Sequence, residues 1–177
     1  SLERVIGLAE VMDFLAVING EDRMMDIIDF MDKKGLYLQG HAPYVSGRML
    51  SAYLCGGPNT CHETRDSDEA LEKIRNGMFV DARDSSITKN VKEVYEGVKG
   101  IKFFDHLCFC TDDREADDIL HVGHLNDVVR AAISYGMDPV TAIKSATYNT
   151  AREIHIENLG AIAPGYVADM LLVDSLE

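Results

Sequence analysis

The sequence lacks several features that would place it in a common functional class. Its four cysteines form no C-x-x-C pair, the spacing that marks many structural zinc sites and thiol redox motifs. No apolar run approaches the length of a membrane span, and no signal peptide is visible. The cysteines are best interpreted as reduced, small apolar residues, and we expect a cytoplasmic protein.

Basic residues are few relative to acidic ones. The 177 residues include 17 lysines and arginines against 30 aspartates and glutamates, which gives a formal net charge of −13 at pH 7. A surface this acidic repels nucleic-acid phosphates and anionic lipid, so we expect neither nucleic acid nor a membrane as a partner. A small neutral molecule such as a purine base is compatible with this charge.

The chain has no Ser-rich or Pro-rich linker, and helix-like and strand-like segments alternate along it. We predict helices over residues 20–34, 46–56, 66–77, 123–135 and 138–154. Asp66 with Glu69 resembles a capping box at the start of the third, and Asp138 with Pro139 forms an N-cap and first-turn pair at the start of the last. Strands are predicted at residues 36–40, 78–83, 101–110 and 170–173, with a short one leading to Cys61. The one boundary we expect lies near residues 156–160 and divides the chain into 1–156 and 157–177.

Repeated β-α units indicate an α/β fold with a parallel sheet and helices packed outside it. Polar residues stand where the predicted strands end, with His41, His62 and Arg83 at intervals of 21 residues and Asp112 after the next strand. In a (β/α)₈ barrel these strand ends form the active site. A whole barrel needs about 250 residues, so four or five strands predict either a partial barrel or an open sheet.

Four of these positions carry side chains that bind metals. Imidazole nitrogens of His41 and His62, together with carboxylates of Asp112 and of the earlier Glu10, suit zinc, iron or manganese. A single histidine beside a glycine is more often a loop or capped core residue. Four such residues at the ends of successive predicted strands are much harder to explain by chance, so we predict a metal site.

Two further residues near these strand ends have open interpretations. Glu63 follows His62 directly and is either a proton-transfer group, a partner of a metal ligand, or a solvated carboxylate. Arg83 ends a predicted strand and could bind substrate, although a salt bridge is the commoner role of such an arginine.

Taken together, several motifs resemble the adenine deaminase family of the amidohydrolase superfamily, from roughly Glu10 to the end of the chain. In chain order they are Leu8-Ala9-Glu10-Val11-Met12, Gly40-His41-Ala42-Pro43, Cys61-His62-Glu63, Cys110-Thr111-Asp112-Asp113, Gly123-His124-Leu125, Asp138-Pro139 and Ala163-Pro164-Gly165-Tyr166-Val167-Ala168-Asp169. Single motifs occur widely among amidohydrolases. The ordered set of His41-Ala42-Pro43, His62-Glu63 and Thr111-Asp112-Asp113 is what makes the resemblance specific.

The resemblance implies a role for each predicted ligand. Glu10 would be the metal-bridging carboxylate on barrel strand four, and His41 and His62 the ligands on strands five and six. Asp112 would be the strand-eight ligand that also moves a proton. The implied reaction is hydrolysis of adenine to hypoxanthine and ammonia, with two divalent ions (manganese, iron or zinc) in the intact enzyme and catalytic roles for Asp112 and Glu63.

Two departures from the family pattern stand out. No two histidines have the His-x-His spacing of barrel strand one, so we expect a C-terminal part, about strands four to eight, that is inactive alone. The loop with Arg83 and Asp84, which would contact substrate, reads Arg-Asp-Ser-Ser where the family usually has Arg-Glu-Gly-Ser. A homo-oligomer or a complementing N-terminal segment is then expected, and residues 157–177 would supply strands of a small accessory β-sandwich.

Two alternatives stay open. Other amidohydrolases share the metal ligands and act on a different cyclic amide or amidine. A half-barrel could also survive as a non-catalytic module that binds a partner, because its unpaired strand edges favour association.

Overall fold

The computed structural model describes residues 4–176 and contains five parallel strands arranged in chain order. Strand β1 (Gly7–Val11) pairs with β2 (Tyr37–Gly40), and β3 (Thr60–Cys61), β4 (Phe79–Arg83) and β5 (Leu107–Cys110) form a three-stranded sheet. The two sheets meet where the backbone N–H of Gly40 donates to the Thr60 hydroxyl at 2.7 Å. The predicted α/β class with a parallel sheet is confirmed.

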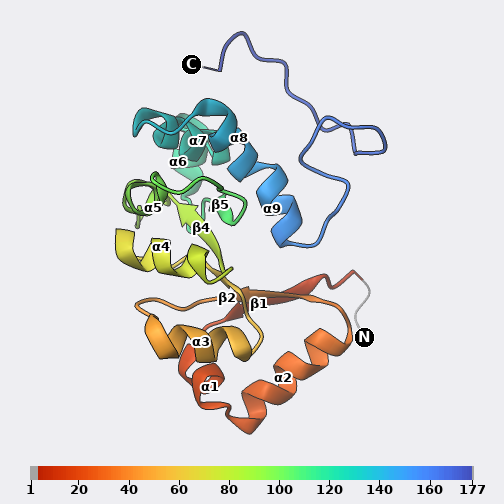
Figure 1. The fold of residues 1–177 in the computed structure, drawn as a ribbon. Helices are drawn as coiled ribbons and strands as arrows, with labels where there is room; N and C mark the ends of the chain where they lie inside the picture. The colour runs from red at the N-terminus through yellow and green to blue at the C-terminus, as the bar shows by residue number, and fades with distance from the viewer. Residues whose placement is uncertain (1–3, 177) are drawn as a thin grey trace.

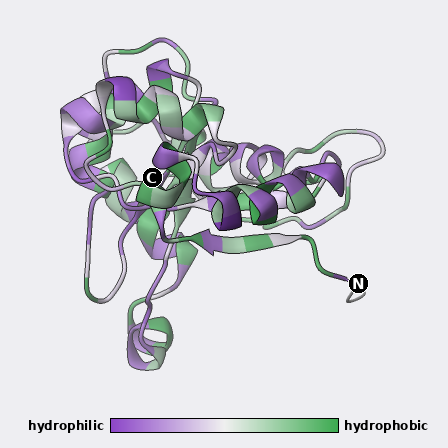
Figure 2. Cartoon of the chain, turned by 90° about the horizontal axis from the view of Figure 1, so that it is seen from below, coloured by the Kyte–Doolittle hydropathy of each residue, from purple (hydrophilic) through white to green (hydrophobic). Residues whose placement is uncertain are grey.

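Helices follow the strands, and most of them lie on one side of the two sheets (Figure 1). In the described residues they are α1 (Phe14–Asn19), α2 (Asp22–Lys33), α3 (Gly47–Cys55), α4 (Ser67–Arg75), α5 (Val91–Val98), α6 (Ala116–His121), α7 (Leu125–Ser134), α8 (Pro139–Ala146) and α9 (Tyr148–Glu153). Seen from below in Figure 2, hydrophobic and hydrophilic residues share the same helices, as expected for one buried face and one solvated face.

Local capping explains where two of the helices begin. The Asp66 carboxylate accepts the backbone N–H of Glu69 at 2.9 Å, and the Asp138 carboxylate accepts that of Thr141 at the same distance, ahead of Pro139. Both N-caps were predicted and are confirmed. The predicted single helix over 138–154 is instead two helices, α8 and α9, which meet at Thr147, the C-cap of the first and N-cap of the second.

Two clusters of buried side chains hold the helices on the strands. One lies between β4, β5 and helices α4, α5, α7 and α8, and includes Val80, Leu107 and Val128. The other lies around β1 to β3 and α1 to α3, and includes Ile28 and Leu50. Burial of these apolar side chains fixes the five strand ends on a common side, where the polar residues emerge.

Two predicted strands differ from the structure. The prediction of a strand over 101–110 is too long, because residues 101–106 form turns and only Leu107–Cys110 pairs with β4. The predicted strand at residues 170–173 is absent, and residues 157–176 form neither helix nor strand. Leu171 and Leu172 are 93% and 102% exposed, because no described strand lies beside them to accept their backbone hydrogen bonds.

No helix among the residues described is both long and apolar enough to cross a membrane.

Candidate metal centre

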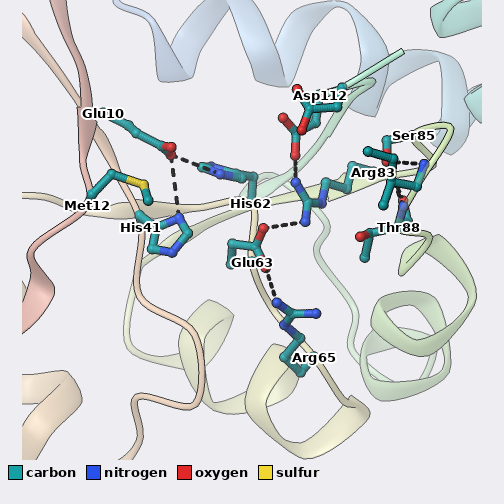
Figure 3. A pocket seen from close by; sticks show the side chains of 12 residues that line it. Glu10, Met12, His41, His62, Glu63, Arg65, Arg83, Ser85, Thr88 and Asp112 are labelled. Carbon is teal, nitrogen blue, oxygen red and sulfur yellow. Dashed lines mark hydrogen bonds and ion pairs between the residues drawn. The ribbon is translucent and has the colours of Figure 1, made fainter. Parts of the chain in front are cut away.

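Three strand ends bring Glu10, His41 and His62 together (Figure 3). The Glu10 Oε2 atom lies 2.9 Å from His62 Nε2 and 3.5 Å from His41 Nδ1. The two imidazole rings meet edge to face with their centroids 5.3 Å apart. One donor atom from each residue lies within 4.8 Å of the other two, although the residues are separated by 21 or more positions in the sequence.

The close approach of β2 and β3 sets the spacing of the two histidines. A Cβ atom at Gly40 would lie 2.2 Å from the Thr60 carbonyl oxygen, so only glycine lets these strands meet at that point. The next residue, His41, is fixed by its backbone N–H, which donates to the Tyr53 hydroxyl at 3.1 Å. His62 follows directly after β3, so both rings leave their strands at the same level.

The electrostatic surroundings leave these three side chains suited to a cation. Burial is the largest cause that lowers the pKa of His41, with a further contribution from His62 and opposition from Glu10 and Glu63. A neutral imidazole keeps a lone pair for a metal. The Glu10 Oε2 and His41 Nδ1 atoms are buried without a hydrogen bond, so a nitrogen–nitrogen–oxygen donor set faces one point. These residues fit a divalent transition-metal ion.

A second group of charged residues lies beside this donor set. The Arg83 guanidinium contacts the carboxylates of both Glu63 and Asp112, and Arg65 Nη2 lies 2.6 Å from Glu63 Oε2. Donor atoms of His62, Glu63 and Asp112 also lie within 4.8 Å of one another, so His62 belongs to both groups. Asp112 has a φ of 51°, in the left-handed region that aspartate adopts more readily than most residues.

The structure thus brings all five predicted ligand and catalytic residues to one cavity, together with Arg83, but Asp84 does not line it. The Asp84 side chain is buried and accepts the backbone N–H of Val91 at 3.4 Å, at the start of α5. Burial raises the pKa of this carboxyl. Asp84 therefore does not face this cavity, and its predicted contact with substrate stays a prediction.

The cavity at this site has a volume of about 270 Å³, near the lower end for small-molecule sites. Its lining is mainly polar and comprises Glu10, Met12, His41, His62, Glu63, Arg65, Arg83, Ser85, Ile87, Thr88, Asp112 and Asp113. Arg65 and Thr88 were not predicted to be part of the site. The only sequence signal for Arg65 is its position three residues after His62, and Thr88 has none.

Comparison with known proteins agrees with this arrangement. Residues 2–177 match the profile of the amidohydrolase family. The chain belongs to this family. It is 42% identical over 175 residues to the adenine deaminase of Petrotoga mobilis and 41% identical over 174 residues to that of Kosmotoga olearia, covering 99% and 98% of this chain.

Adenine deaminase 1 of Rhizobium meliloti is 39% identical over 175 residues. This amidohydrolase chain spans about 30% of the length of each of these curated relatives. A crystal structure described as an amidohydrolase superposes with a TM-score of 0.61 at 22% identity, covering 88% of this chain and 42% of the other. That structure supports the fold alone.

A second cavity of the amidohydrolase chain, about 440 Å³, lies on the other side of Glu10, His62 and Asp112. Its lining also includes two buried acids, Asp81 on β4 and Glu153 in α9. Burial, followed by the neighbouring Asp81, raises the pKa of Glu153 to about 9. Sequence reasoning missed both acids, since nothing in a strand or helix pattern marks an acid that folds inward.

Proposed function

We propose that this chain forms the metal-binding and substrate-binding part of an adenine deaminase, which hydrolyses adenine to hypoxanthine and ammonia. The convergence of Glu10, His41 and His62 on one point carries the proposal, because it is the donor set expected for a hydrolytic metal centre. The proposed substrate, adenine, comes from relatives that are 36–42% identical and are called adenine deaminase. The five parallel strands would then be strands four to eight of a (β/α)₈ barrel.

The residues that would hold metal are Glu10, His41, His62 and Asp112, with two ions (manganese, iron or zinc) in the intact enzyme. A bound divalent ion would supply Lewis-acid activation of water near neutral pH. Asp112 lies beside His62 and would accept the proton that the attacking water loses. Glu63 would pass a proton toward the purine and the departing ammonia.

Arg83 would keep these two carboxylates in working positions. Its guanidinium contacts Glu63 and Asp112 at once, so one cation joins the two carboxylates. Its side chain is 7% exposed and lines the cavity, where it would also meet the substrate. A neutral purine suits a site in which most charges already have partners.

The test is adenine turnover and metal content of the complete protein that contains residues 1–177, purified with Mn²⁺ or Fe²⁺ supplied. Glu10→Gln should lower metal affinity at least about tenfold and turnover with it, since one donor oxygen becomes an amide. Glu96→Gln, at an exposed position paired with Lys99, is the matched control and should change neither.

The same assay separates the alternatives. Hydrolysis of a hydantoin or dihydropyrimidine without adenine turnover would replace the proposed substrate with another cyclic amide. A complete, folded protein that binds no metal and turns over none of these compounds would refute the enzymatic proposal and favour a partner-binding module.

A further inference from the structure

Helix α4 carries a buried ion pair that lies outside the metal site but contacts both histidine-bearing loops. The Lys73 side chain is fully buried, and its Nζ atom lies 2.5 Å from Glu69 Oε1, one helical turn earlier. Neither residue lines the cavity of the metal centre. A buried lysine costs free energy unless its ammonium protons are satisfied, so its other partners indicate what the residue does.

The lysine bonds to a residue adjacent to each histidine. Its Nζ atom donates to the carbonyl oxygen of Ala42 at 2.7 Å, one residue after His41. It also donates to the Sγ atom of Cys61 at 3.2 Å, one residue before His62. One ammonium group thus joins the ends of β2 and β3 at the level of the two imidazoles.

The glutamate also contacts both loops, further along each one. The Glu69 Oε1 atom accepts the backbone N–H of Tyr44 at 2.9 Å, and Oε2 accepts that of Arg65 at 2.9 Å. Tyr44 is the third residue after His41, and Arg65 is the third residue after His62. The predicted capping arrangement of Glu69 with Asp66 is therefore only half formed, because the carboxylate reaches the two loops.

A thiol completes the connection between the loops. The Cys61 Sγ atom accepts the backbone N–H of Ala42 at 3.4 Å and that of Glu63 at 3.3 Å, in addition to Lys73. Lys73, Glu69 and Cys61 thus make eight hydrogen bonds to the two loops and to one another, one of them from Lys73 to the Thr64 hydroxyl at 3.5 Å, and none of the eight involves either imidazole.

We infer that Glu69 and Lys73 are positioning residues that hold the His41 and His62 loops at the separation a metal ion needs, an inference that rests on the proposed function. Metal ligands must be held within roughly 0.5 Å of their working geometry. A well-packed apolar pair would stabilise α4 equally well, but it could not bond to both loops. The ion pair therefore supplies the geometry of the site more than the stability of the helix.

The experiment compares three variants of the complete protein that contains residues 1–177. Lys73→Met keeps the side-chain volume and removes the ammonium. The double variant E69Q/K73M also removes the unpaired carboxylate, which keeps the test available where K73M alone does not fold. Asn149→Leu is the matched control, since Asn149 is equally buried and donates to two backbone carbonyls, of Phe104 and Leu107, away from both loops.

The readouts are the dissociation constants of Zn²⁺ and Co²⁺, measured by competition with a chromophoric chelator, the visible absorption spectrum of bound Co²⁺, and thermal unfolding. We expect K73M and E69Q/K73M to weaken metal binding by about 10–100-fold and to shift the Co²⁺ bands. Asn149→Leu should lower the melting temperature by a similar amount and leave affinity and spectrum unchanged.

The outcomes separate the two proposals. Wild-type protein that binds Zn²⁺ and Co²⁺, with folded lysine variants that bind them equally well and with the same spectrum, overturns the positioning role alone. A loss of affinity in Asn149→Leu as large as in the lysine variants would also overturn it, since general destabilisation would then explain the effect. Wild-type protein that binds neither ion overturns the proposed function and this inference together.

Discussion

Substitution of Glu153 by glutamine should make the protein more stable at alkaline pH, and by an amount that grows with pH. Glu153 is only 4% exposed and lies beside Asp81, and the Tyr37 hydroxyl contacts its carboxyl group. Burial, followed by the charge of Asp81, raises its pKa from 4.5 to about 9. Glutamine keeps the shape, an acceptor for Tyr37 and a donor toward Asp81, and it cannot ionise.

The direction in which pH changes the free energy of unfolding depends on whether the folded or the unfolded chain holds the Glu153 proton. Below pH 4.5 both the folded and the unfolded chain hold it, and the full stability is present. Between pH 4.5 and about 9 the unfolded chain loses the proton while the folded chain keeps it, so the free energy of unfolding falls as pH rises. One proton corresponds to about 1.4 kcal/mol per pH unit, so from pH 6 to pH 8 the loss is about 3 kcal/mol.

The assay is urea unfolding of wild type and Glu153→Gln at pH 6, 7 and 8, with the difference in unfolding free energy followed against pH. Titrating groups that do not contact Glu153 are common to both proteins and cancel in that difference. Glu157→Gln, at an exposed carboxylate, is the control and should show a difference independent of pH. A Glu153→Gln difference that stays constant from pH 6 to 8 would refute the reasoning, because Glu153 would then ionise in the folded state as it does in the unfolded one.

Two further predictions concern the site and the scaffold. Arg83→Met in the complete protein should lower kcat for adenine by about 100-fold or more, because Glu63 and Asp112 lose their shared cationic partner. The circular dichroism spectrum should keep its helical signal, and an unchanged kcat would show that Arg83 has no part in the mechanism. Asp138→Ala should cost about 1 kcal/mol of stability, since the N-cap bond to Thr141 is lost, and should leave metal content unchanged in the same preparation.

Much of the scaffold follows from local patterns in the sequence. The N-caps Asp66 and Asp138 and the strand-helix rhythm depend on neighbouring residues, so they were predicted correctly. The meeting of Glu10, His41 and His62 was predictable too, because parallel strands connected in chain order place their carboxyl ends on one side.

The features that the sequence did not predict depend on contacts between residues that are distant in the sequence. No sequence pattern shows that Lys73, on helix α4, bonds to two loops. None shows either that the Asp84 side chain lies against α5 while the Arg83 side chain faces the cavity. The predicted strand at residues 170–173 was wrong for the same reason. Its apolar residues favour a strand, but a strand forms only where another offers backbone partners.

The charges around the cavity give a separate argument for a metal at Glu10. Glu63 lies against Arg83 and Arg65, and Asp112 lies against Arg83, so both carboxylates have a cationic partner. In the part of the chain that the structure describes, Glu10 contacts no lysine or arginine. Its ion-pair contacts are both histidines, with 2.9 Å to His62 and 3.5 Å to His41.

The pKa of His41 is lowered chiefly by burial, so that imidazole does not neutralise Glu10. A partly buried carboxylate between two imidazoles, with one oxygen that accepts no hydrogen bond, is costly to maintain without a cation. A divalent ion would compensate that carboxylate and use the imidazole lone pairs at once, which a lysine or arginine at the same point could not do. The distribution of charge therefore favours a metal between Glu10, His41 and His62, beside which Arg83 contacts Glu63 and Asp112, the two carboxylates proposed to move protons.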